Sequence, residues 1–100
     1  MAKSQSPAQK ATVERVMHEF KEGELRTGSD GAKVKNPKQA IAIALSEAGA
    51  STRETPKRNK TALARTKGKE KRGETAQAET EGKKAQDRTL AKGARGGKKS

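Results

Sequence analysis

The chain has 100 residues, of which 24 are Lys or Arg and 12 are Asp or Glu, giving a net charge of +12. Hydrophobic residues make up only 28% of it, with one aromatic residue and no cysteine, which excludes disulfides, thiol catalysis and cysteine-based metal sites. So little apolar surface cannot offset an ordering cost of about 1–2 kcal/mol per residue, and we expect most of the free chain to be disordered.

The first predicted element is a helix over residues 7–22. Ser6 is placed to cap it, Pro7 suits the first helical position, and Gln9 completes a capping box. Apolar residues then recur at i, i+3, i+4 and i+7, which is one stripe of an amphipathic helix: Val13, Val16, Met17 and Phe20. Gly23 is a natural stop because glycine adopts the left-handed conformation easily.

The linker over residues 24–35 is expected to be either a short hairpin or an irregular loop. Its centre, residues 28–31, reads Gly-Ser-Asp-Gly, which is turn chemistry. Together with Lys33 and Lys35 this turn could instead present amides and cations to a phosphate. The Walker order of residues is absent, so the sequence favours an ordinary turn.

A second helix begins with the same pattern. Asn36 is a capping residue, Pro37 opens the helix, and Gln39 lies where a capping box needs it. A stripe follows at helical spacing, formed by Ile41, Ala44, Leu45 and Ala48. Residues 40–45 also alternate in hydropathy as a strand would, but the alanines and the stop at Gly49 favour a helix.

These elements predict a mostly α protein in which the ordered helical part and the basic part lie in different halves of the chain. Residues 1–6 are expected to be flexible, residues 7–51 to form a small two-helix module around Phe20 and Leu45, and residues 52–100 to form a basic tail. The tail is expected to be largely disordered, with helices that form transiently or on binding over 51–72 and 74–92. A module this small is expected to be marginally stable or to be stabilised by self-association or a ligand.

The charge indicates a polyanionic partner. Residues 1–50 carry 8 Lys/Arg and 6 Asp/Glu, whereas residues 51–100 carry 16 and 6, so a net charge of +10 lies in the second half. Such a tail can neutralise phosphates and release counterions without reading sequence. The absence of Tyr and Trp disfavours stacking on single strands, so we expect backbone contact with duplex DNA or with structured RNA, and we favour DNA. The candidate phosphate-binding residues are Lys33, Lys35, Lys38, Lys57, Arg58, Lys60, Arg65, Lys67, Lys69, Lys71, Arg72, Lys83, Lys84, Lys92, Arg95, Lys98 and Lys99.

Residues 16–28 and 33–49 form a distinctive sequence motif. It resembles a family of small basic bacterial proteins of unknown function that share a motif like MHEFKxGELxSG, then KQAIAIALSEAG, and a Lys/Arg-rich tail. The resemblance covers about residues 13–51, with Thr27 where the motif has serine, and the tail agrees in composition only. It implies a bacterial origin and a self-contained helical motif, and it supplies no catalytic residues. The expected location is therefore the cytoplasm, on the bacterial nucleoid.

The sequence offers few residues for metal binding, catalysis or membrane binding. Glu14, His18 and Glu22 share one helix face, but one histidine with loose carboxylates is more typical of a solvated face pairing with nearby Lys and Arg. We therefore predict no metal, no cofactor and no small-molecule substrate. Enzyme activity is not expected, because neither a nucleophile–base set nor enough apolar surface for a pocket is present. Membrane binding is not expected either, because no apolar anchors accompany the charges.

A second function class remains open. The stripe of Met17, Phe20, Ile41 and Leu45 could bind a protein partner or a second copy of the chain, with the tail serving as a hydrophilic shield. The chain would then be a protein-interaction or stress-protective factor rather than a DNA-binding one.

Overall fold

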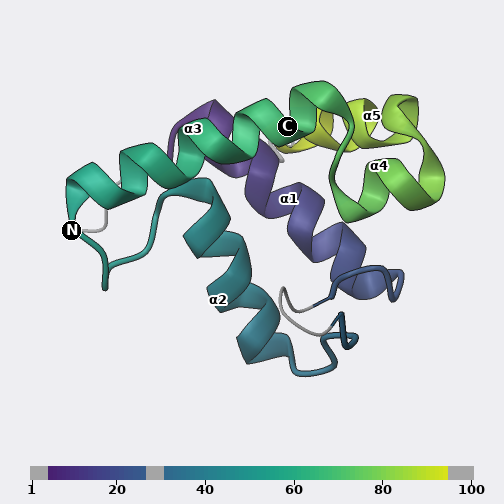
Figure 1. Ribbon diagram of the computed structural model, residues 1–100, viewed down its shortest axis with the longest axis horizontal. Helices are drawn as coiled ribbons and strands as arrows, with labels where there is room; N and C mark the ends of the chain where they lie inside the picture. The colour runs from purple at the N-terminus through teal and green to yellow at the C-terminus, as the bar shows by residue number, and fades with distance from the viewer. Residues whose placement is uncertain (1–4, 27–30, 95–100) are drawn as a thin grey trace.

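The computed structural model describes residues 5–26 and 31–94, which form five α-helices (Figure 1). They are α1 (Pro7–Lys21), α2 (Pro37–Ala48), α3 (Pro56–Arg72), α4 (Ala76–Glu81) and α5 (Lys83–Ala94). Within the described ranges there is no β-strand, so the prediction of a mostly α protein is confirmed.

Helix α1 begins with the predicted capping box. The Gln9 amide donates to Ser6 Oγ at 3.2 Å, and the Ser6 amide donates to Gln9 Oε1 at 2.8 Å. The helix ends at Lys21, one residue before the predicted end, and Gly23 has a φ of 74°. Local sequence alone therefore fixes both ends of this helix.

Helix α2 is also where the sequence predicts it, so the strand alternative for residues 40–45 is wrong. Asn36 Oδ1 accepts from the Lys38 amide at 2.8 Å, and Gly49 ends the helix at a φ of 69°. Gly49 meets a second requirement as well, because a Cβ there would collide with the backbone carbonyl of Asn59 in α3. Glycine at this position lets the end of α2 lie directly against α3.

The linker between α1 and α2 has paired ends. Arg26 and Lys33 form one antiparallel bridge, and the Val34 amide donates to the Leu25 carbonyl at 2.9 Å. This is the short pairing that the sequence allowed as one of two alternatives. Of the turn and phosphate cradle predicted at 28–31, residues 28–30 lie outside the described residues.

The core between α1 and α2 is built from smaller residues than predicted. Its buried members are Val16, Leu25, Val34, Ala40 and Ala44, against which Val13, Met17, Phe20 and Ile43 are partly buried. Phe20 and Leu45 are therefore not its centre. On α2 the buried face is the alanine row, Ala40, Ala44 and Ala48, whereas Ile41 is 48% exposed. Ala44 and Ala48 of the predicted stripe face inward, but Ala40 rather than Ile41 or Leu45 completes the buried row.

The second half of the chain differs from the prediction more than the first half does. The sequence predicts a two-helix module with a largely disordered tail, whereas residues 56–94 contain three helices that pack on the first two. Helix α5 lies along α1, α4 packs on α5 and α1, and α3 runs across the end of α2 (Figure 1). The segments expected to be only transiently helical are therefore the ones that form α3, α4 and α5.

Small residues allow α5 to approach α1 closely. Gly93 is buried, and a Cβ built on it would lie 2.8 Å from the Ala11 Cα and 2.8 Å from the Lys10 carbonyl oxygen. Ala11 is itself only 4% exposed. The contact is therefore backbone against backbone, which needs little apolar side-chain surface and explains why hydropathy does not predict it.

We expect Gly93→Leu to separate α5 from α1. The new side chain has no room beside Ala11, and overpacking of this kind costs about 1–3 kcal/mol or more. Thermal unfolding followed by circular dichroism should show a melting temperature roughly 10 °C lower.

The matched control for this variant is Ala91→Leu. It adds the same side chain to an exposed position of the same helix and should leave the melting temperature nearly unchanged. Equal melting temperatures for the two variants would contradict the close packing of α5 on α1.

Candidate nucleic-acid interface

Helix α3 sorts its residues by charge. Its inward positions recur at helical spacing and hold small, apolar or paired side chains: Asn59, Ala62, Leu63, Thr66, Lys67 and Glu70. The outward positions hold the exposed cations Lys57, Arg58, Lys60, Arg65, Lys69, Lys71 and Arg72. We call these seven residues the α3 cationic face. The one carboxylate of the helix, Glu70, is 3% exposed and points inward, so the face itself carries no acid.

Most of the α3 cationic face is free of ion pairs. Arg58 lies 3.7 Å from Glu54, and Arg72 lies 3.0 Å from Glu74. Among the residues that the structure describes, the other five form no ion pair, and they are Lys57, Lys60, Arg65, Lys69 and Lys71. Their charges are therefore available to a partner of opposite sign.

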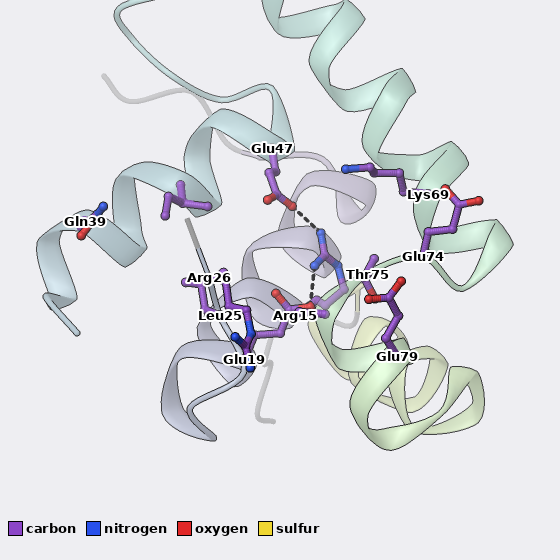
Figure 2. Close-up of a pocket in the computed structure, with 12 residues that line it drawn as sticks. Arg15, Glu19, Leu25, Arg26, Gln39, Glu47, Lys69, Glu74, Thr75 and Glu79 are labelled. Atoms are coloured by element: carbon purple, nitrogen blue, oxygen red, sulfur yellow. Dashed lines mark hydrogen bonds and ion pairs between the residues drawn. The ribbon is translucent and has the colours of Figure 1, made fainter. Parts of the chain in front are cut away.

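The orientation of α3 depends on a buried ion network centred on Arg15. This side chain is 2% exposed and donates to three carboxylates, which come from α1, α2 and α3. Its Nη1 lies 2.8 Å from Glu19, its Nη2 lies 2.6 Å from Glu47, and its Nε lies 2.9 Å from Glu70. Figure 2 shows the pairs with Glu19 and Glu47 among the residues that line a cleft.

The carboxylates of this network have further partners. Glu70 Oε2 accepts from Thr12 Oγ1 at 2.8 Å, and Glu70 Oε1 accepts from Lys67 Nζ at 2.8 Å. Glu19 Oε2 also accepts from the backbone amide of Gln77 at 2.9 Å. Each buried carboxylate is thus bonded from more than one helix, which is the condition under which buried ions are tolerated.

The network changes the acidity of its members. Burial alone would lower the pKa of Arg15, but the attraction of Glu19 and Glu47 and the hydrogen bonds to Glu47 and Glu70 outweigh it and raise that pKa. Burial raises the pKa of Glu19, and the attraction of Arg15 and the amide of Gln77 offset only part of this effect. Arg15 therefore remains charged, and its charge must be matched inside the protein.

Two buried glutamines extend the polar interior towards α5. Gln86 Nε2 donates to the Glu70 carbonyl at 2.9 Å, and Thr75 Oγ1 donates to Gln86 Oε1 at 2.6 Å. Gln77 Nε2 donates to Thr89 Oγ1 at 2.9 Å. The Gln86 bond satisfies a backbone carbonyl near the end of α3 and joins α3 to α5, and the Gln77 bond joins α4 to α5.

The cleft in Figure 2 lies among α1, α2 and the connection from α3 to α4. Its lining is mixed in charge, with carboxylates at Glu74 and Glu79 and cations at Arg26 and Lys69 beside the Arg15 network. The Arg15 guanidinium, which could otherwise hold an anion, is already engaged by three carboxylates. The Arg15 charge in this cleft is therefore already matched by carboxylates of the protein itself.

The remaining predicted phosphate-binding residues lie apart from α3. Lys33, Lys35 and Lys38 are exposed in the linker and at the start of α2. Lys83, Lys84 and Lys92 are exposed on α5, where Lys83 pairs with Asp87 at 2.9 Å and Lys92 approaches Glu14 at 3.9 Å. Arg95, Lys98 and Lys99 lie outside the described residues. The structure therefore gathers one subset, the α3 cationic face, on a single helix.

The structure also regroups the predicted histidine face. His18 Nε2 lies 2.7 Å from Glu81 Oε2 at the end of α4, and Glu24 lies beside both. Burial and the neighbouring carboxylate of Glu81 raise the pKa of Glu24 to about 7. The hydrogen bonds of Glu81 with Glu24 and His18 lower its own pKa. Glu14 and Glu22, predicted to share this face with His18, are not part of the cluster.

Comparison with known proteins places the sequence in a family. A model of a family of unknown function, DUF6496, matches residues 4–60, which is more than half of the chain. The chain belongs to the DUF6496 family. The DUF6496 match spans α1, α2 and the first residues of α3. No curated protein and no solved structure matches the chain.

The described helices do not include a candidate membrane span. None of α1 to α5 combines the length and the apolar character that crossing a membrane requires.

We expect Arg15→Met to destabilise the protein strongly, because it leaves Glu19 buried without a counter-charge and leaves Glu70 paired with Lys67 alone. Removing one partner of a buried ion pair costs about 3–5 kcal/mol. Urea denaturation followed by circular dichroism should show this loss in the free energy of unfolding.

Glu47→Gln is the matched control, because the Glu47 side chain is 37% exposed and its pair with Arg15 is partly screened. It should cost at most about 1 kcal/mol. Losses of similar small size in the two variants would show that Arg15 does not hold the helices together.

Proposed function

We propose that this protein binds the phosphate backbone of nucleic acid, with little sequence specificity and without enzymatic activity. The observation that supports this most is the α3 cationic face, seven exposed Lys and Arg side chains on one helix with no carboxylate among them. Phosphate neutralisation with counterion release needs only such an array of cations. Together with the resemblance of residues 13–51 to small basic bacterial proteins, this chemistry leads us to propose a nucleoid-associated role.

The dimensions of α3 suit a polyanion better than a single phosphate. A helix of 17 residues is about 25 Å long, since each residue rises about 1.5 Å. A DNA duplex presents one negative charge per about 1.7 Å of its axis, so the α3 cationic face can meet several phosphates at once. Aromatic side chains, on which unpaired bases would stack, are absent from α3, so the proposal favours duplex DNA.

The packing of α3 also favours binding energetically. A disordered tail must lose conformational freedom when it follows a phosphate backbone, and each immobilised side chain costs roughly 0.5–1.5 kcal/mol. A helix held in place by Glu70 has already lost its backbone freedom. The proposed ligand therefore meets a preformed row of charges rather than a chain that must be ordered.

The alternative, a stripe that binds a protein partner, has less support. Val16 is fully buried, and Met17 and Phe20 pack against the core between α1 and α2. Of the predicted stripe, Ile41 is the large apolar residue that is exposed. One isoleucine offers little area for a protein interface, because isolated exposed apolar residues are common on ordinary surfaces.

The test compares two triple variants with equal loss of charge. Lys57→Gln/Lys60→Gln/Arg65→Gln removes three cations from α3, while Lys10→Gln/Lys21→Gln/Arg88→Gln removes three exposed cations from α1 and α5. Fluorescence anisotropy with a random-sequence DNA duplex, at several salt concentrations, gives the slope of log K against log salt. The α3 variant should lose about one unit of slope for each cation that contacted a phosphate.

The control variant should keep nearly all of the slope. Equal losses in the two variants would mean that total charge, rather than the α3 cationic face, determines binding. Wild-type affinity that does not change with salt would contradict the proposal altogether.

A further inference from the structure

The cluster around His18 has the composition of a metal site. His18 comes from α1, Glu24 from the loop after α1, and Glu81 from the last residue of α4. Each offers one ligand atom, a ring nitrogen or a carboxylate oxygen, and these atoms all lie within 4.8 Å of one another. Imidazole nitrogen with carboxylate oxygens is a ligand set that zinc accepts.

A second observation points to a missing cation. Glu24 is 9% exposed, and its Oε1 is buried with no hydrogen-bond partner in the part of the chain that the structure describes. A buried carboxylate oxygen without a partner is costly. The same carboxylate lies against that of Glu81, so two acids share a small volume with one imidazole. A divalent cation among them would satisfy the oxygen and cancel the repulsion between the acids.

The geometry needs only a small adjustment. His18 Nε2 and Glu81 Oε2 are 2.7 Å apart. Tetrahedral zinc, with bonds near 2.0–2.1 Å, places its ligands about 3.3 Å apart. The two side chains are each 28% exposed, so they have room to separate and to admit an ion from solvent.

We propose that His18, Glu24 and Glu81 bind a zinc ion, with solvent completing its coordination. The ion joins the end of α1 to the end of α4, two segments 63 residues apart in the chain, counted from His18 to Glu81. It therefore fastens the second half of the protein onto the first. This site is independent of the α3 cationic face and does not rest on the proposed function.

The test titrates the full chain, freed of metal, with zinc chloride alone. Calorimetry should give one ion per chain, and thermal unfolding should show a melting temperature higher by roughly 10 °C when free zinc exceeds its Kd about 100-fold. Magnesium, which prefers oxygen ligands and retains its waters, should produce neither effect. Cobalt(II) offers an independent readout, because its visible spectrum reports ligation at the site.

His18→Gln and Glu81→Gln should each weaken zinc binding at least tenfold and remove the increase in melting temperature. Glu22→Gln is the matched control, because it removes an exposed carboxylate one turn from His18 and should leave both measurements unchanged. Circular dichroism without metal verifies that every variant is folded, and Glu81→Gln keeps the size and the polarity of the side chain that it replaces. The proposal is overturned if the wild type binds no zinc, or if Glu22→Gln weakens binding as much as His18→Gln.

Discussion

A guanidinium that is 2% exposed cannot lose its charge, so the protein must supply carboxylates where Arg15 lies. It does so from three helices, with Glu19 on the same helix, Glu47 on α2 and Glu70 on α3. The position of α3 is thereby tied to that of α1. Gln77 and Gln86 continue this dependence, since they bond to Glu19 and to the Glu70 carbonyl and so bring α4 and α5 into the same arrangement.

The burial of these carboxylates also determines which charges lie on the surface of α3. The acid of α3 is used inside, so the outer side of that helix is left with cations alone. A chain with twice as many basic as acidic residues could distribute its acids as surface pairs, which would screen its positive charge. Here Glu19 and Glu70 are buried instead, so neither carboxylate lies among the exposed cations of α3. The interior network and the proposed phosphate contacts are two consequences of one placement of charge.

The sequence predicts the first half of the fold well, because the signals there are local. Ser6 with Gln9, Asn36 with Pro37, and the glycines at 23 and 49 fix helix ends without reference to the rest of the chain. The inward face of α2 is predicted less well. Hydropathy favours Ile41 and Leu45, while the actual contact is made by alanines that allow close approach.

The second half could not be predicted from composition, because its packing uses little apolar surface. Glu70, Gln77 and Gln86 are buried through hydrogen bonds and ion pairs, and Gly93 through backbone contact. A scale of hydrophobicity counts all of these as solvent-facing. One signal was available: Glu70 is an isolated acid in a Lys-rich segment, and Arg15 and Glu19 are four residues apart on the side of α1 away from the predicted apolar stripe. Pairing Arg15 and Glu19 with the Glu70 segment requires knowing which distant segments meet. The same knowledge is needed to pair His18 with Glu81.

Residues 56–94 fold onto the first two helices without a ligand. Amide hydrogen exchange of the full chain, free of nucleic acid, tests it most directly. Our account predicts that amides in the middle of α3 and α5 exchange at least about 100-fold more slowly than in an unstructured chain, as amides in packed helices do. Exchange at the unstructured rate throughout 56–94, with protection confined to α1 and α2, would contradict it and return the protein to a two-helix module with a disordered basic tail.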